Sequence, residues 1–303
     1  MWEPVQVPFV NSEPLPPLPT TSEIHACTNI LGETTLGQKT ATKIVAVNDK
    51  IVVKYGTCVE TWEGQALVLL ERHAPKIPAP RLYKMYQEDQ EVFLIMRRVP
   101  GVQLDSIWSS LAASEKDDII NKLRDICEKM RKVECPIPNF YGSLDGGGLH
   151  AFLFRNINDY RKYLGPFFSE SDFVAGLVGN YRALIDRDKH QSPNYKAAFY
   201  EKYMFRVLEG HRSVLTHGDL QQKNIMIVEN KSGLNSDGGR SFDVVLVDWE
   251  SAGWFPEYWE FFIASWTLSF HWEDEWSWRA QEFLPVFPAE LAVLQQIDRD
   301  MGV

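Results

Sequence analysis

The chain has 303 residues, of which 45% are hydrophobic and 24% are charged, a composition that suits a globular protein with a core of its own. Its formal net charge of -10 argues against a nucleic-acid partner, because a phosphate backbone is bound by clustered Lys and Arg. The N-terminus lacks the basic and apolar regions of a signal peptide, and no segment approaches the roughly 20 apolar residues that span a bilayer. We therefore expect a cytoplasmic protein without a membrane partner. The four cysteines form no C-x-x-C pair, and we expect them to be free thiols in a reducing compartment.

Residues 1–20 are rich in proline, which favours an extended backbone with few hydrogen bonds. The pattern fits either an arm that lies on the body of the protein or a mobile leader. Beyond it, two β-branched runs predict a hairpin over residues 43–54. Apolar residues at helical spacing predict a helix over 62–73, and two more strands are predicted at 82–83 and 92–96.

After Gly101 the pattern changes to helical spacing. A helix with one apolar face is predicted over 114–133, and two or three more are expected between 157 and 209. Short strands within 214–228 and 242–249 flank a loop, and the tryptophan-rich remainder is predicted to be helical.

This order of elements predicts an α+β protein with a bilobal layout. We expect a proline-rich arm over residues 1–20 and a small, strand-rich N-lobe over 21–98. A larger, mainly helical C-lobe is expected over 99–303.

The most informative polar residues lie between two of the predicted strands. His217, Gly218 and Asp219 follow an apolar run, and Asn224 comes five residues after Asp219. A later apolar run ends in Asp248. This is the order in which kinases carry the residues of their catalytic and metal-binding loops.

Phosphoryl transfer explains the choice of these residue types. Mg²⁺ neutralises a triphosphate and prefers oxygen ligands, which Asn224 and Asp248 would supply. The attacking hydroxyl needs a carboxylate to orient it and to accept its proton, and Asp219 suits that role. His217 is expected to hold the loop through hydrogen bonds to nearby backbone and not to carry a proton.

The motif His-Gly-Asp, four residues, Asn and then a strand ending in Asp resembles the signature of the aminoglycoside phosphotransferase and choline kinase-like family. Residues 217–224 and Asp248 match it at each diagnostic position, and the resemblance extends over residues 25–295. The segment from Asp248 to Glu260 is similar to members of this phosphotransferase family from filamentous fungi. The resemblance implies a bilobal, protein-kinase-like fold, with nucleotide bound by the N-lobe and with the catalytic loop and acceptor site in the C-lobe.

The resemblance also implies an activity, namely transfer of the γ-phosphoryl group of ATP to a hydroxyl of a small molecule, with Mg²⁺ as cofactor and GTP as an alternative donor. Lys54 would clamp the phosphates, held by a glutamate of the next helix. Glu63 fits the family's Glu-x-x-Ala-Leu pattern best, and Glu60 and Glu71 are its rivals.

The segment Phe93–Gly101 resembles the hinge of such a fold. The resemblance implies that Met96 faces the nucleotide base and that backbone groups near Arg97 and Val99 form hydrogen bonds with it. A loop that covers the triphosphate is expected near residues 36–41, although this segment is not rich in glycine.

The tryptophans between residues 249 and 278 predict an aromatic core between helices. Alternatively, some of them line an acceptor pocket together with His271, Glu273, Asp274 and Glu275, a mixture that would suit an amine-bearing acceptor. Aminoglycosides, choline-like amines, sugars and fungal secondary metabolites all remain open as acceptors, and the oligomeric state is not readable from the sequence.

Two other functional classes share parts of this pattern. A protein kinase is disfavoured, since Asp248-Trp-Glu stands in place of Asp-Phe-Gly and only a short gap separates Asp248 from Pro256. The main alternative is a catalytically idle kinase-fold protein that binds a nucleotide or a partner. The presence of Lys54, Asp219 and Asn224 argues against it.

Overall fold

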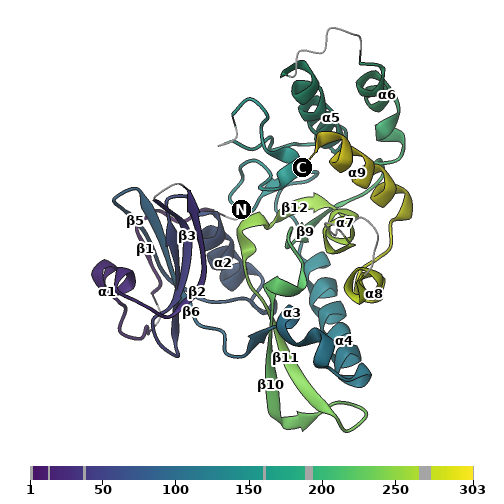
Figure 1. The fold of residues 1–303 in the computed structure, drawn as a ribbon. Coiled ribbons are helices and arrows are strands. Elements are labelled where there is room, and N and C mark those ends of the chain that lie inside the picture. Colours follow the sequence, from purple (N-terminus) through teal and green to yellow (C-terminus); the bar gives the residue numbers. More distant parts are fainter. Residues whose placement is uncertain are drawn as a thin grey trace. The chain divides into compact units, whose positions relative to one another are not determined.

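The computed structural model describes residues 3–12, 14–36, 39–159, 162–187, 194–265 and 274–302. The chain divides into two compact units (Figure 1). The first unit combines Glu3–Glu115 with Lys223–Glu250, and the second unit is built from Lys116–Gln222 and Ser251–Val303. Strands and helices occur together as predicted, which confirms the α+β class. The lobe boundaries after residues 20 and 98 stay a prediction.

An antiparallel sheet of six strands, in the order β1-β5-β6-β4-β3-β2, is the framework of the first unit. The strands are β1 (Phe9–Val10), β2 (Ile30–Leu36), β3 (Lys39–Ala46), β4 (Ile51–Gly56), β5 (Leu82–Glu88) and β6 (Glu91–Arg97). Two helices accompany it, α1 (Thr21–His25) and α2 (Trp62–His73). The proline-rich segment therefore includes an arm, because β1 forms an edge strand that pairs with β5.

The two faces of this sheet have different environments, since successive side chains of a strand point to opposite sides. One face carries an apolar cluster of Ile24, Val45, Ile51, Val53, Tyr55, Tyr83, Tyr86, Phe93 and Ile95. Lys54 lies between Val53 and Tyr55 of this cluster and therefore points to the other face. Helix α2 packs on that face against β5 (Figure 1). The helix approaches the strands closely at Gly64, where a Cβ atom would lie only 2.5 Å from Sδ of Met85.

A second, three-stranded sheet of the first unit has the order β11-β10-β7. It consists of β7 (Val102–Gln103), β10 (Ile225–Leu234) and β11 (Arg240–Leu246), and α3 (Leu104–Ile107) and η1 (Trp108–Ser110) follow β7. The hairpin register pairs Ile225 with Leu246. As a result, the residues just before β10 and just after β11 lie at the same end of the hairpin.

The second unit is mainly helical. It contains most of α4 (Ala113–Arg131), and α5 (Glu170–Arg187), α6 (Tyr195–Tyr203), α7 (Trp259–Ser265), α8 (Glu275–Phe283) and α9 (Pro288–Met301). A small sheet in the order β8-β12-β9 consists of β8 (Gly142–Ser143), β9 (Ser213–Thr216) and β12 (Gly253–Pro256). Its short 3-10 turns are η2 (Phe152–Phe154) and η3 (Met204–Arg206), whereas η4 (Gln222–Asn224) and η5 (Trp249–Ser251) each span a point where the chain passes from one unit to the other.

Aromatic side chains form much of the core of the second unit. Trp254 and Trp259 are almost fully buried, and the Trp259 ring stacks on Phe255 with 5.1 Å between the centroids. This confirms the predicted aromatic core for the buried tryptophans. The prediction is wrong for Trp278, which is 61% exposed, and Trp266 and Trp272 lie outside the described residues. Among the described helices, none has the length and apolar character needed to cross a membrane.

Candidate active site

Lys54 is a buried cation in the middle of the first sheet. β4 lies between β3 and β6, and the β4–β6 register pairs Lys54 with Leu94. The lysine is 7% exposed. A buried ammonium is stable only when it is paired, so its partners define the chemistry of this face of the sheet.

Three carboxylates contact the Lys54 ammonium. The Nζ atom lies 2.7 Å from Oδ1 of Asp248, 2.9 Å from Oε2 of Glu63 and 2.9 Å from Oε2 of Glu250. We call these four residues the Lys54 cluster. Burial alone would lower the pKa of the lysine, but attraction to the three carboxylates outweighs burial and raises that pKa well above its usual range.

The glutamate partner of Lys54 is the one favoured by the sequence pattern. Glu63 belongs to the first turn of α2 and is 4% exposed. Of its rivals, Glu71 accepts hydrogen bonds from Arg81 and Asn11, and Glu60 is exposed. Burial raises the pKa of Glu63 to about 7; Lys54 opposes this shift and the neighbouring carboxylates add to it.

The β10–β11 hairpin brings Asn224 and Asp248 to the same end of the second sheet. Asn224 directly precedes β10, and its carbonyl oxygen accepts a hydrogen bond of 2.9 Å from the Val247 amide. Asp248 follows with a φ of 65°, a left-handed conformation that Asp tolerates better than most residues. The two predicted metal ligands are 24 positions apart in the sequence, and the hairpin brings them together.

The Lys54 cluster offers oxygen atoms suited to a divalent cation. One carboxylate oxygen each from Glu63, Asp248 and Glu250 lie within 4.8 Å of one another. Because one ammonium cannot neutralise three carboxylates, the cluster has an excess of negative charge when all three are ionised. Such donors fit hard cations such as Mg²⁺, which prefer carboxylate and amide oxygens. Sequence reasoning missed Glu250, although its position two residues after Asp248 was a usable signal.

The predicted hinge follows β6. Met96 is buried and lies two residues after Leu94, so it shares the α2-facing side of the sheet with Lys54. The Arg97 amide donates a hydrogen bond of 2.8 Å to the Arg81 carbonyl. Within the described part of the chain, no hydrogen bond engages the Val99 amide. The Arg97 amide is therefore engaged within the sheet, whereas the Val99 amide has no such partner among the described residues.

In the second unit, the predicted catalytic loop follows β9. His217 is fully buried, and its Nδ1 atom accepts a hydrogen bond of 3.3 Å from the Asp219 amide. Gly218 adopts a φ of 82°, and a Cβ atom there would lie 2.3 Å from the Ser251 carbonyl oxygen. Asp219 itself is partly exposed. The buried histidine and the glycine thus fix the backbone on which Asp219 stands.

Glu260 is a second anchor of this loop, and sequence reasoning missed it. The Oε2 atom accepts a hydrogen bond of 2.6 Å from the His217 amide, and Oε1 accepts one of 3.3 Å from the Gly218 amide. Burial raises the pKa of Glu260 to about 7, while the two amides oppose the shift and Asp219 adds to it. The signal in the sequence was a single carboxylate inside the apolar helix α7.

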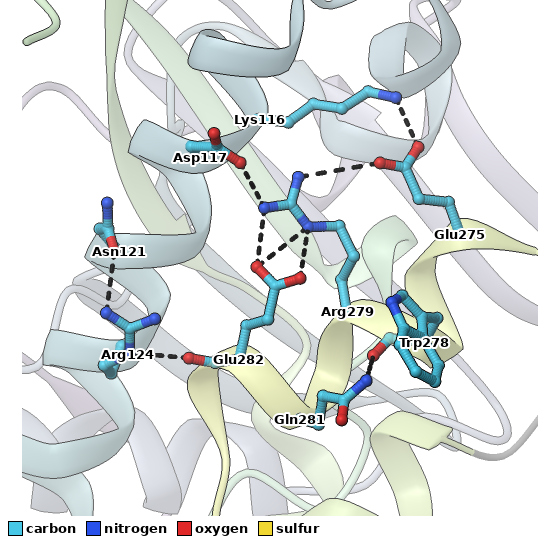
Figure 2. Close-up of polar contacts among 9 residues, drawn as sticks. All are labelled: Lys116, Asp117, Asn121, Arg124, Glu275, Trp278, Arg279, Gln281 and Glu282. Atoms are coloured by element: carbon cyan, nitrogen blue, oxygen red, sulfur yellow. Dashed lines mark hydrogen bonds and ion pairs between the residues drawn. The ribbon is translucent and has the colours of Figure 1, made fainter.

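The acidic residues considered for an acceptor pocket have structural partners where they are described. The Asp274 side chain caps α8 by accepting the Ser277 amide at 2.7 Å. Glu275 pairs with Lys116 of α4 and with Arg279 (Figure 2). His271 and Glu273, like Gly37 and Gln38 of the expected phosphate-covering loop, lie outside the described residues.

The sequence and the fold are similar to those of known phosphotransferases. The model of the phosphotransferase enzyme family matches residues 61–284. The solved gentamicin complex of APH(2")-IIa has a TM-score of 0.56 at 14% identity, covering 95% of this chain and 90% of that one. ADP-bound aminoglycoside phosphotransferase APH(2'')-Ib has a TM-score of 0.57 at 15% identity, covering 92% and 88%.

A third solved structure has the same fold. It is a thermostable mutant of aminoglycoside phosphotransferase APH(4)-Ia in a ternary complex with AMP-PNP and hygromycin B, with a TM-score of 0.51 at 12% identity. The alignment covers 84% of this chain and 75% of that one. No curated protein matches the sequence. Because the sequence identities to these solved structures are only 12% to 15%, the similarity shows the fold alone, which is protein-kinase-like.

Proposed function

The chain belongs to the phosphotransferase enzyme family, and we propose on this basis that it transfers the γ-phosphoryl group of ATP to a hydroxyl of a small molecule. The observation that carries the proposal is the Lys54 cluster, in which one buried ammonium lies within 2.9 Å of each of three carboxylates. The Lys54 ammonium and the neighbouring carboxylates together suit a triphosphate that binds as a complex with a divalent metal ion. The ammonium would bind phosphate oxygens, and the carboxylates would hold the cation.

Within the Lys54 cluster the proposed roles differ. Lys54 binds the phosphates, and Glu63 keeps its ammonium in place from α2. Asp248 and Glu250, with the side-chain oxygen of Asn224, would hold Mg²⁺. The bound ion would neutralise charge on the triphosphate as the phosphoryl group is transferred.

Adenine is proposed to bind at the hinge. Met96 would contact the base, and the Val99 amide would donate a hydrogen bond to it. At Arg97 the amide is engaged by Arg81, so the proposed contact is its carbonyl oxygen. Backbone recognition of this kind leaves GTP as an alternative donor.

Asp219 is proposed to act on the acceptor. Its carboxylate orients the hydroxyl and takes up the proton as the new oxygen–phosphorus bond forms and ADP leaves. His217 and Glu260 do not react in this scheme. They hold the loop through the Asp219, His217 and Gly218 amides.

The acceptor is proposed to be a small molecule, and an amine-bearing one suits the net charge of -10. Two of the solved structures with this fold are complexes with gentamicin and with hygromycin B. Free cysteines at four positions suit a reducing compartment, so we place the reaction in the cytoplasm.

Calorimetric titration with Mg²⁺–AMP-PNP tests the proposed nucleotide site. Lys54→Met should weaken binding by about 100-fold, or about 2.7 kcal/mol. Lys50→Met is the matched control, since this lysine lies in the exposed turn before β4 and should leave the affinity unchanged. Equal affinity of the Lys54→Met and wild-type proteins would contradict the proposal. Tight binding without turnover on any acceptor would favour the idle kinase-fold alternative.

A further inference from the structure

The N-terminal arm, residues 3–12, is integrated into the first unit. Its strand β1 pairs with β5, with Phe9 opposite Met85 and Val10 opposite Lys84. The Asn11 amide extends this pairing by donating to the Tyr83 carbonyl at 2.9 Å. The arm therefore contributes backbone hydrogen bonds to the edge of the first sheet.

A two-point contact joins the arm to α2. The Val5 amide donates to Oε1 of Gln65 at 2.8 Å, and Nε2 of Gln65 donates to the Val5 carbonyl at 2.8 Å. Gln65 is 5% exposed. Its buried amide group is therefore satisfied on both atoms by one residue of the arm, in the way that a neighbouring strand would satisfy it.

A second contact lies near the other end of α2. The Asn11 side chain donates to Oε2 of Glu71 at 3.0 Å and accepts from Nη2 of Arg81 at 3.0 Å. Arg81 also donates to Oε1 of Glu71 at 2.8 Å. The arm thus holds α2 at two points, separated by more than one turn of helix.

The same turn of α2 carries the functional glutamate. Glu63 contacts Lys54, Gly64 lies against the sheet, and Gln65 contacts the arm. The residue before the helix, Thr61, makes no side-chain hydrogen bond to cap it. A helix start without such a cap is weakly held by its own sequence, so contacts from outside have more influence on its position.

We propose that the N-terminal arm is a strap that sets the position of α2, and that Gln65 is the positioning residue through which it holds Glu63 against Lys54. The expected effect on nucleotide affinity rests on the proposed function. The effect on α2 itself does not, because it concerns only contacts within the first unit.

Loss of the strap has a defined physical consequence. Without the Gln65 side chain, the Val5 amide and carbonyl lose their partners and the arm no longer fixes the first turn of α2. That turn then opens more often, and Glu63 spends less time beside Lys54. We expect backbone amides of α2 to exchange about 10-fold faster and the affinity for Mg²⁺–AMP-PNP to fall about 10-fold, which corresponds to about 1.4 kcal/mol.

Hydrogen exchange of the protein without nucleotide tests the strap directly. Gln65→Ala should accelerate exchange in α2 relative to β4. The matched control is Gln6→Ala, which changes an exposed glutamine of the arm. This variant should leave the exchange rates of both α2 and β4 unchanged. Val45 lies in the apolar cluster on the opposite face of the sheet. Val45→Ala should therefore accelerate hydrogen exchange in α2 and β4 to a similar extent. Unchanged exchange of α2 relative to β4 in Gln65→Ala would overturn the proposal.

A truncated chain provides an independent test. Removal of residues 1–12 should reproduce the Gln65→Ala pattern, and a synthetic peptide of these residues should restore slow exchange in α2. If the truncated chain does not fold, Gln65→Ala decides the question. If the wild-type chain binds no nucleotide, the proposed function fails, yet the exchange pattern still supports or refutes the strap.

Discussion

Glu260 is a carboxylate buried beside two backbone amides, and its ionisation couples the catalytic loop to pH. Burial raises its pKa from 4.5 to about 7. The Glu260 carboxyl group therefore binds its proton more tightly in the folded state than in the unfolded chain. The resulting stability is fully present below about pH 4.5 and is lost as the pH rises through about 7.

The expected measurement is a pH series of urea unfolding. From the Glu260 carboxyl alone, the wild-type protein should lose up to about 3 kcal/mol of unfolding free energy between about pH 4.5 and 7. Glu260→Gln should remove this share of the slope. Glu63, whose pKa is also raised to about 7, contributes separately in the same window, so Glu63→Gln should remove a second share. An unchanged slope in Glu260→Gln would refute the assigned cause.

Gly218 is required by both its conformation and its surroundings. Its φ is 82°, and a Cβ atom would lie 2.3 Å from the backbone of Ser251. Gly218→Ala should therefore displace the loop that carries Asp219 and lower turnover by at least about 100-fold, as expected for misplaced catalytic groups. Gly210→Ala is the matched control, because its φ is 91° but nothing lies within 4 Å of the added atom. Similar turnover of the two variants would show that the clash is unimportant.

Individual site residues were predictable where a local pattern located them. The Lys54 strand, the Glu63 pattern and the spacing of Asp219, Asn224 and Asp248 are all local features of the sequence, and the structure brings Lys54, Glu63 and Asp248 together. The partners of Gln65 and Glu260 were not readable. Both residues act on backbone groups far away in the sequence, and hydrogen bonds to backbone leave no trace in side-chain identity.

At the scale of elements, α4 and α8 are joined by a polar network around Arg279. Figure 2 shows its guanidinium surrounded by Asp117, Glu275 and Glu282. Arg279 is buried, while its three partners are partly exposed. A buried arginine with several charged partners should contribute more to stability than an exposed ion pair does.

Arg279→Ala should accordingly lower the unfolding free energy by about 1–2 kcal/mol, a range discounted for the exposure of its partners. The comparison is Lys132→Ala, whose pair with Glu128 spans 3.5 Å and is mostly exposed, and which should cost less than about 0.5 kcal/mol. Guanidinium unfolding of both variants measures the difference. Equal losses would mean that the network does not join the two helices.

The elements themselves were largely predictable. The hairpin over 43–54 and the helix over 62–73 have clear periodicity, and the structure has β3, β4 and α2 there. For the arm, the sequence is compatible both with a segment that lies on the body of the protein and with a mobile leader. Its pairing with β5 joins residues about 75 positions apart, and a proline-rich sequence favours extended backbone whether or not a partner strand is present.

At the scale of the whole molecule, the α+β class followed from the order of strands and helices, and the family from a short motif. The grouping of Lys223–Glu250 with Glu3–Glu115 in one unit was not predictable. It depends on contacts of β10 with β7 and on the ion pair between Arg240 and Glu115, which no local pattern reveals. Domain boundaries read from composition cannot anticipate a segment that returns to an earlier part of the chain.

The central claim is that this chain transfers a phosphoryl group with Asp219 as its base. The most direct measurement incubates the protein with Mg²⁺–ATP and a panel of amino alcohols, sugars and aminoglycosides, and detects the phosphorylated product by ³¹P NMR. We expect one class of hydroxyl compounds to be phosphorylated by the wild-type protein. Asp219→Asn should lose at least about 100-fold in rate while retaining its affinity for Mg²⁺–AMP-PNP. Product formation by Asp219→Asn at the wild-type rate would contradict the account.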